Sequence, residues 1–459
     1  MSLYESYAAV VAFAIGATFV LTFPVRWLAF RFGAVDHPGE HRMHSRPTPV
    51  VGGAAMFVAF CGSMALASRL TPLSGMFHPS SEEPWGVIIA AAVIYLVGLI
   101  DDVRDISAPA KVAGQVLAAM VLVFWGVTMY YFKIPFETNL FTLSPEILPL
   151  ITAVWVVGMA NAVNLIDGLD GLAAGIVGIA SAALFIYGLR LDHLGDLSSN
   201  NIGPLIAAIT FGVCVGFLPH NFHPARIFMG DGGALFLGLA MAASTMVIGG
   251  RTENVAAFTD APGLTFFRFA PLFIPFFILG VPILDTGFAI IRRTARRSNF
   301  AERDLGHLHH RLVRLGHGHR RAVLILWAWT ALLSAFVLVP TFAPQANAYV
   351  PIGLAAFAVG LYTIFRPAGR AVPPSDGHMR AGDEILVEPE PDGASPDGAT
   401  PNGATPNGAS TVDPTSLAPT WNGQVRAGGE LRVASEFDAA SDKAAAVDPA
   451  SFAHHDDQV

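Results

Sequence analysis

The chain has 459 residues, of which 53% are hydrophobic and 14% charged, whereas a soluble domain usually carries about 25% charged residues. This composition excludes an ordinary soluble protein and predicts an all-α, polytopic integral membrane protein. The net charge of −8 comes from the C-terminal end, because the residues from Arg366 onward contribute −9 and the rest of the chain +1. The two cysteines, Cys61 and Cys214, lie in apolar runs, which gives no support to a disulfide framework.

The apolar residues gather in runs long enough to cross a bilayer, which takes about 20 residues in a helix. These runs predict about 11 transmembrane helices. They lie near residues 7–28, 50–70, 85–100, 111–132, 147–163, 172–190, 202–219, 232–249, 269–291, 322–340 and 348–365. The first run lacks the basic start and the small-residue cleavage site of a signal peptide, so it is predicted to be a retained span.

The basic residues predict how the spans are oriented. With the N-terminus outside, the loops after spans 1, 3, 5, 7 and 9 hold 16 basic residues, and the opposite side holds five. The positive-inside rule therefore places these loops and the C-terminus in the cytoplasm. We predict a transmembrane catalytic domain at 1–366 and a disordered, acidic Pro/Gly/Ala-rich cytoplasmic tail at 367–459, where Pro391–Ser410 repeats turn-forming residues. The tail is either a passive extension or a segment with a regulatory or docking role.

The first polar motif along the chain follows span 3 and has the form DDxxD, with carboxylates at Asp101, Asp102 and Asp105. Adjacent carboxylates repel one another, and Mg²⁺ reconciles them because it binds one or two carboxylates together with substrate phosphates. A solvated loop that stops a helix explains the same letters. Soluble isoprenoid synthases use a similar motif, so it does not by itself name a reaction.

The second motif joins spans 5 and 6, where Asn161, Asn164, Asp167 and Asp170 recur every three residues. This spacing places them on one face of a helical stretch, while the intervening glycines let a ligand approach the backbone. Asn and Asp side chains can bind hydroxyls, an amide or a base edge. The alternative is simple capping of the two spans.

The third motif runs from Asn221 to Gly233 and opens span 8 at Asp231. A glycine-containing helix N-terminus predicts a phosphate cradle, because free N–H groups and the helix dipole both favour anions. Asp231 is equally compatible with an N-cap. The ring of Phe228 could stack on a base or pack internally.

Two further basic segments lie on the predicted cytoplasmic side. The longest loop holds Asp285, a run of arginines, and three histidines at His307, His309 and His310. Phosphate or sugar binding suits these histidines better than zinc, which would need more ligands. Ahead of span 2, Arg42 and His44 add positive charge beside a proline-rich turn, which topology alone partly explains.

In this order, the motifs DDxxD, NAVNLIDGLDGLAAG, NFHPARIFMGDGG and PILD…RR…HLHH resemble the polyprenyl-phosphate N-acetylhexosamine-1-phosphate transferases of glycosyltransferase family 4. The resemblance runs from about Arg42 to Leu312. One branch uses UDP-MurNAc-pentapeptide and typically has Lys at the position of Asp105. The other uses UDP-GlcNAc and carries DDxxD and HxHH, as here at 101–105 and 307–310. The chain is similar to the second branch.

The resemblance implies an enzyme of a bacterial inner (plasma) membrane whose active site faces the cytoplasm. It would transfer GlcNAc-1-phosphate from UDP-GlcNAc to polyprenyl phosphate with Mg²⁺, or Mn²⁺ in its place, releasing UMP and initiating a cell-envelope glycan. Its partners would be these substrates and membrane lipid, without nucleic acid; a homodimer is left open. The other candidates are a phospho-MurNAc-pentapeptide transferase and a membrane transporter, although the acidic residues crowd one face and no inverted repeat is evident.

The resemblance also implies roles for individual residues. The implied metal ligands are Asp231, Asp101 and Asp102; the implied catalytic residues are Asp101, Asp102, Asp231, His309 and His310; and the implied substrate-binding residues are Arg42, His44, Asp105, Asn164, Asp167, Asp170, Asn221, Phe228 and His307. Asp102 or Asp101 could instead act as a base toward the lipid phosphate. A one-step transfer and a two-step route through a phospho-aspartate both stay open.

Overall fold

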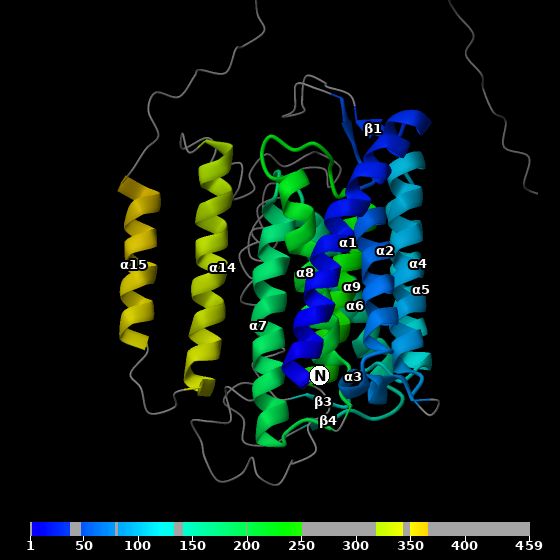
Figure 1. The fold of residues 1–459 in the computed structure, drawn as a ribbon, viewed down its shortest axis with the longest axis vertical. Coiled ribbons are helices and arrows are strands. Elements are labelled where there is room, and N and C mark those ends of the chain that lie inside the picture. The colour runs from blue at the N-terminus through cyan, green and yellow to red at the C-terminus, as the bar shows by residue number, and fades with distance from the viewer. Residues whose placement is uncertain are drawn as a thin grey trace, which may run out of the picture. The chain divides into compact units, whose positions relative to one another are not determined.

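The computed structural model describes residues 2–36, 47–78, 81–132, 141–198, 200–249, 318–342 and 349–365. These residues form helices and two short antiparallel strand pairs (Figure 1). The helices are α1 (Leu3–Phe32), α2 (Gly53–Ala67), α3 (Thr71–Ser74), a 3-10 helix (Gly75–Phe77), α4 (Glu83–Arg104), α5 (Ala108–Phe124), α6 (Leu148–Ile166), α7 (Leu172–Leu194), α8 (Gly203–Asn221), α9 (Gly230–Gly249), α14 (His319–Phe342) and α15 (Tyr349–Phe365). The strands are β1 (Val35–Asp36) with β2 (Thr48–Pro49), and β3 (Tyr131–Phe132) with β4 (Phe141–Thr142).

Among the described residues, seven helices are long and apolar enough to cross a membrane: α1, α4, α6, α7, α8, α9 and α14. An eighth candidate is α2 continued through α3 and the 3-10 helix, with a bend of 98°. Apolar helices α5 and α15 are shorter. The prediction of a polytopic all-α membrane protein is therefore confirmed. The prediction of 11 spans and of their orientation stays a prediction.

Ten of the predicted runs coincide with described helices, and the run at 269–291 lies outside the described residues. The run at 111–132 was predicted too long, because α5 ends at Phe124. Gly126 has a left-handed φ of 75°, and the N–H of Val127 donates to the carbonyl of Leu122. This Schellman-type ending uses the freedom of glycine to stop the helix. The boundary at 366 and the tail at 367–459 also lie outside the described residues.

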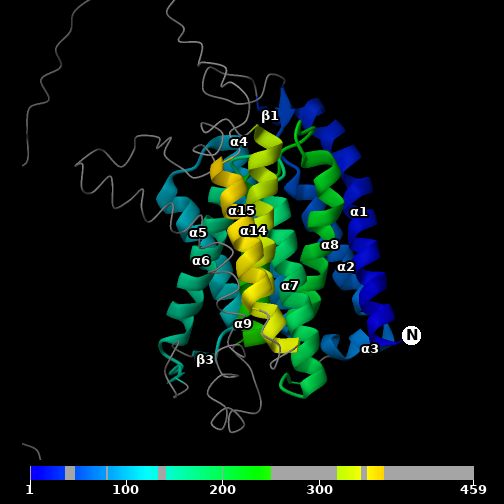
Figure 2. The same cartoon turned by 90° about the vertical axis from the view of Figure 1, so that its left-hand side faces the viewer.

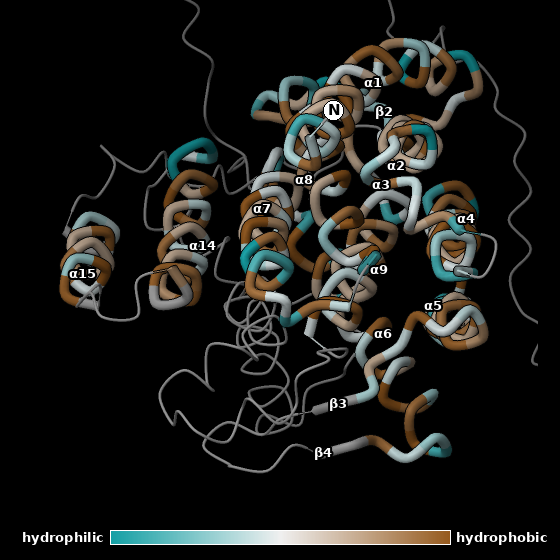
Figure 3. Tube along the Cα trace, turned by 60° about the horizontal axis from the view of Figure 1, so that its bottom comes forward, coloured by the Kyte–Doolittle hydropathy of each residue, from teal (hydrophilic) through white to brown (hydrophobic). Residues whose placement is uncertain are grey.

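Helix α9 is the centre of the bundle, enclosed by α2, α4, α6, α7 and α8 (Figure 3). Its residues from Gly232 to Gly249 are all buried. Its neighbours approach closely through small residues: a Cβ added to Gly98 of α4 would lie 2.5 Å from the Cα of Gly232. Helices in membranes pack through small residues because lipid gives little hydrophobic drive for association.

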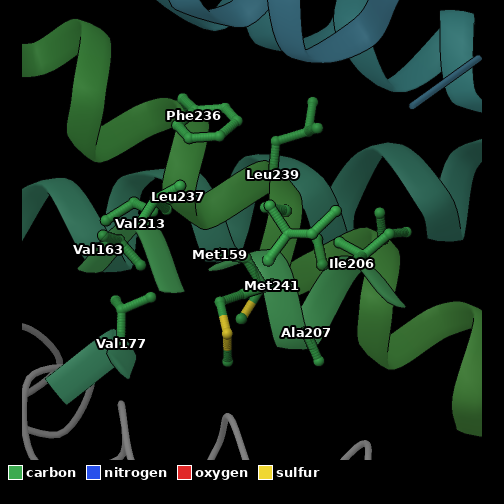
Figure 4. Close-up of a cluster of buried hydrophobic side chains, with 14 of the residues drawn as sticks. Met159, Val163, Val177, Ile206, Ala207, Val213, Phe236, Leu237, Leu239 and Met241 are labelled. Atoms are coloured by element: carbon green, nitrogen blue, oxygen red, sulfur yellow. The ribbon is translucent and has the colours of Figure 1, made fainter. Parts of the chain in front are cut away.

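The apolar core lies around this helix. Figure 4 shows side chains from α6, α7, α8 and α9 in one cluster, among them Val163, Val177, Val213 and Leu237. Large apolar side chains on the outer helices stay exposed, such as Leu117 on α5 and Val154 on α6, as expected of faces that contact lipid. The core fixes the rotation of the helices, and with it the direction of the polar side chains at their ends.

The alternating helices bring several polar segments to one end of the bundle. Hydrogen bonds there join the C-terminal ends of α4, α6 and α8 to the N-terminal ends of α5, α7, α9 and α14 (Figure 2). The β1–β2 pair lies at the same end, because the N–H of Phe228 donates to the carbonyl of Pro49 at 2.8 Å. The second and third motifs therefore lie beside DDxxD at this end of the bundle.

Candidate active site

Three oxygen atoms from three helices surround the ammonium group of Lys111, in the first turn of α5. Asp101 Oδ2, from the last turn of α4, lies 2.8 Å from Lys111 Nζ. Asp231 Oδ2, from the first turn of α9, forms a second ion pair with it. The Asn164 amide of α6 accepts from Lys111 at 3.0 Å and donates to Asp231 Oδ1 at 2.9 Å, in the orientation that satisfies both of its ends. We call these four residues the cation cluster.

The cation cluster is partly buried, since the side chains of Asp101 and Lys111 are 14% and 15% exposed. Its frame is local. The other oxygen of Asp101 accepts from the N–H of Ile106 at 2.9 Å and so fixes the turn between α4 and α5. One turn further into the bundle, Gln115 and Asn161 exchange two hydrogen bonds and join α5 to α6. The cluster therefore presents three converging oxygens on a rigid support.

Asp102 has a different task from its neighbour. Its two carboxylate oxygens accept hydrogen bonds from the N–H groups of Asp231 at 2.8 Å and Gly232 at 3.1 Å. These are free N–H groups of the first turn of α9, where a negative charge is favoured by the helix dipole. Asp102 thus caps α9 and holds Asp231 in place.

This arrangement corrects the predicted phosphate cradle at the start of α9, because the chain's own carboxylate takes the N–H groups of Asp231 and Gly232. The side chain of Asp231 points to Lys111 and Asn164, so Asp231 does not serve as the N-cap that the sequence also allowed. Gly230 makes the approach possible: its φ is +73°, and a Cβ there would lie 2.6 Å from Asp102 Oδ2. The prediction that Asp102 itself binds a metal stays a prediction.

Asn221, at the end of α8, joins two loops of the site. Its Oδ1 accepts from the N–H of Gly171 and its Nδ2 donates to the carbonyl of Ile227, each at 3.0 Å. Both bonds are buried. The side chain therefore fixes the loop before α7 against the loop before α9, and both amide ends are committed to that task.

Asp167 follows α6 and lies near enough to the carboxylates of Asp231, Asp102 and Asp170 to feel their charges. Burial raises the pKa of Asp167 well above its usual range, and the negative charges of Asp231, Asp102 and Asp170 raise it further. A cation or a hydrogen-bond donor from a ligand would relieve this repulsion. Asp167 is therefore a carboxyl group suited to receive a donor.

Asp170, three residues later, already has partners. Its Oδ2 accepts from His223 Nδ1 at 2.7 Å and from the N–H of Ala225 at 3.1 Å. Its own N–H donates to His319 Nε2, at the start of α14, at 3.0 Å. The second and third motifs are thus in direct contact.

The remaining predicted residues differ in how far the structure places them. Asp105 ends α4 with a left-handed φ of 47° and is exposed; among the described residues no hydrogen bond or ion pair joins its side chain to the cation cluster. Phe228 is half-buried, and its carbonyl accepts from the N–H of Gly52 at 2.9 Å. The predicted roles of Arg42, His44, His307, His309 and His310 concern residues outside the described part.

Lys111 and His319 were missed by the sequence analysis. Lys111 counted there only toward membrane orientation, although it is one of three lysines in a chain with 24 arginines. That rarity, beside DDxxD on the same side, was the available signal. His319 carried no such signal, because it stands 149 positions from its partner.

The chain also matches proteins of known family. Residues 84–249 match the model of "Glycosyl transferase family 4". The decaprenyl-phosphate N-acetylglucosaminephosphotransferase of Mycobacterium tuberculosis (strain H37Rv) is 43% identical over 322 residues, which cover 69% of this chain and 78% of the relative. This chain belongs to glycosyl transferase family 4. The family region contains α4 to α9, and so all four residues of the cation cluster.

Other relatives cover both branches of the family. The protein of Mycobacterium leprae with the same name is 40% identical over 354 residues, covering 76% of this chain and 87% of the relative. The phospho-N-acetylmuramoyl-pentapeptide-transferase of Clostridioides difficile is 28% identical over 352 residues, covering 73% and 98%. The chain is therefore more similar to the two N-acetylglucosamine relatives than to this peptidoglycan relative.

Proposed function

We propose that this family 4 enzyme transfers GlcNAc-1-phosphate from UDP-GlcNAc to a polyprenyl phosphate and releases UMP. The observation that carries the proposal is the convergence of Asp101, Asp231 and Asn164 oxygens on one cation at the polar end of a membrane bundle. Phosphoryl transfer between two anions needs concentrated positive charge at such a place. The names of the mycobacterial relatives supply the donor and acceptor classes.

The cation cluster fits a Mg²⁺ ion. Carboxylate and amide oxygens are the ligands that Mg²⁺ takes, with waters and substrate phosphates filling the remaining positions. Asp101, Asp231 and Asn164 already direct three such oxygens at one positive group. They would hold the metal, which when bound neutralises phosphate charge; Mn²⁺ could replace it.

The other residues of the site have tasks that follow from their positions. The ammonium of Lys111 stands on a flexible four-carbon stem, which can turn from the carboxylates toward a diphosphate. Asp167 offers its carboxyl group to a hydrogen-bond donor of the nucleotide or the sugar, which would relieve its repulsion by the neighbouring carboxylates. Asp102 keeps the backbone of Asp231 fixed while the Lys111 ammonium turns from the carboxylates to the diphosphate.

The reaction itself needs little proton transfer. An oxygen of the lipid phosphate attacks the sugar-bearing β-phosphorus, the P–O bond to the α-phosphate breaks, and UMP leaves with the electron pair. The C1–O bond of the sugar stays intact, so the anomeric configuration is kept. A phosphomonoester has a second pKa of about 6, so the attacking group is mostly dianionic at neutral pH, and positioning matters more than a base.

We also infer that the enzyme lies in the plasma membrane with this site facing the cytoplasm. The positive-inside count supports it, because the loops after predicted spans 1, 3, 5, 7 and 9 hold 16 of the basic residues that flank the spans. Nucleotide sugars are found on that side. The product would be the first lipid-linked intermediate of an envelope glycan.

Two alternatives are separated by one assay. Purified enzyme is given polyprenyl phosphate with either UDP-GlcNAc or UDP-MurNAc-pentapeptide, and UMP release is followed. We expect release with UDP-GlcNAc alone, since Asp105 occupies the position where the peptidoglycan branch typically has Lys. Release only from UDP-MurNAc-pentapeptide would assign the other branch. If neither donor releases UMP in an acceptor-dependent way, a membrane transporter is the remaining candidate. Membership of the family disfavours that candidate.

A further inference from the structure

A second polar network lies beside the cation cluster and joins three segments distant in sequence. The N–H of Asp170 donates to His319 Nε2 at 3.0 Å, and His223 Nδ1 donates to Asp170 Oδ2 at 2.7 Å. Arg320 Nε donates to the carbonyl of His223 at 2.9 Å. The rings of His223 and His319 stack with centroids 4.2 Å apart and planes 18° apart.

The hydrogen bond at Asp170 fixes the chemical state of His319. A backbone N–H can only donate, so Nε2 of His319 must accept with a lone pair. His319 is therefore the neutral tautomer with its proton on Nδ1. A protonated imidazole in this place would turn a donor toward a donor and would lose the bond.

The network holds a loop that regular structure does not hold. Between α6 and α7 the backbone is irregular, and Gly171 has a left-handed φ of +77°. Asn221 and Ala225 hold the loop from the α8–α9 side. His319 holds it from α14, and Arg320 fixes the start of α14 to the same place.

We propose that His319 is a positioning residue, which sets the backbone of Asp170 so that the Asp167–Asp170 loop receives the nucleotide. The inference rests on the proposed function, because it assigns the loop to UDP-GlcNAc binding. His319 does not touch the reacting atoms. Its loss leaves the cation cluster intact and loosens only the nucleotide loop, so substrate binding suffers more than turnover.

A transition-metal site is the competing use of the same groups. The ligand atoms of Asp170, His223 and His319 lie within 4.8 Å of one another. The hydrogen bonds favour positioning, because the Nε2 lone pair of His319 and the Oδ2 of Asp170 already accept from N–H donors. A metal would have to displace these donors.

The test uses two substitutions at one position. His319→Gln keeps an acceptor at about the place of Nε2, and His319→Leu removes it while keeping the bulk. Loss of one hydrogen bond predicts that His319→Leu raises KM for UDP-GlcNAc about three- to tenfold, with kcat within about twofold. His319→Gln should restore a KM close to wild type. Arg321→Ala, an exposed neighbouring change, serves as the control and should change neither constant.

A second readout does not depend on activity. Amide hydrogen exchange of the peptide containing Asp170 should become faster in His319→Leu and stay slow in His319→Gln and Arg321→Ala. Wild-type exchange and wild-type KM in His319→Leu would overturn the proposal. A Zn²⁺-dependent change in rate that His319→Leu and His319→Gln both abolish would overturn it in favour of a metal site. If the wild type released no UMP while the exchange rates still differed between the variants as expected, the proposed function would be refuted instead.

Discussion

Replacing Asn221 by Ala, beside a matched control elsewhere in the bundle, distinguishes an effect on stability from an effect on the geometry of the site. The change removes two buried hydrogen bonds and leaves the N–H of Gly171 and the carbonyl of Ile227 without their partner. Each such group costs about 1–3 kcal/mol, so the free energy of unfolding should fall by about 2–6 kcal/mol. Because the same bonds hold the nucleotide loop, KM for UDP-GlcNAc should also rise.

Asn201 provides a matched control on the opposite end of α8. It is buried, its Nδ2 donates to the carbonyl of Val247 at 3.0 Å, and its Oδ1 accepts from the N–H of Gly203 at 2.9 Å. Asn201→Ala should cost a similar free energy but leave KM unchanged. Unfolding is followed by tryptophan fluorescence in mixed micelles, and activity by UMP release. An equal rise of KM in both variants would refute a specific role for Asn221.

Three further predictions concern the site. Gly230→Ala should lower both stability and activity, because its φ of +73° is strained for alanine by about 1–2 kcal/mol and its Cβ would meet Asp102; Gly126→Ala, with a φ of +75° and open space, should lower only stability. Asp167→Asn should abolish UMP release yet raise the melting temperature at neutral pH. The folded state binds the Asp167 proton more tightly than the unfolded state, so wild-type stability falls as pH rises above the ordinary carboxyl pKa toward the raised one, and the variant should lose that slope. Lys111→Met should bind Mn²⁺ more tightly, measured by electron paramagnetic resonance, because the competing ammonium is gone; unchanged or weaker Mn²⁺ binding would show that the ammonium does not stand in the metal's place.

The positions of the spans could be predicted from the sequence, since runs of about 20 apolar residues satisfy the backbone in lipid only as helices. That the motifs share one side of the membrane could also be predicted. The chain changes sides at every span, so polar segments that follow alternate spans must lie on the same side. The end of α5 at Phe124 was missed, because Val127–Phe132 continues the apolar run while Gly126 ends the helix. Local backbone preference there prevails over hydropathy.

The contacts within the site depend on long-range packing and could not be predicted from spacing. Asp102 caps α9 by accepting from the N–H of Asp231, 129 positions later, and which of two adjacent aspartates does so depends on how α4 rotates against α9. That rotation is set by the close approach of Gly98 and Gly232. Lys111 likewise reaches Asp101 and Asp231 only because α5 packs beside α4.

Asp231 is the central residue of the proposed divalent-cation site for GlcNAc-1-phosphate transfer. The deciding measurement is UMP release by purified enzyme from UDP-GlcNAc, with and without polyprenyl phosphate, over a Mg²⁺ titration in wild type and Asp231→Asn. We expect wild-type release to need both acceptor and Mg²⁺, and the variant, expressed and folded as wild type, to release almost none even at saturating Mg²⁺. Wild-type-like turnover by Asp231→Asn, or release independent of Mg²⁺, would contradict the account.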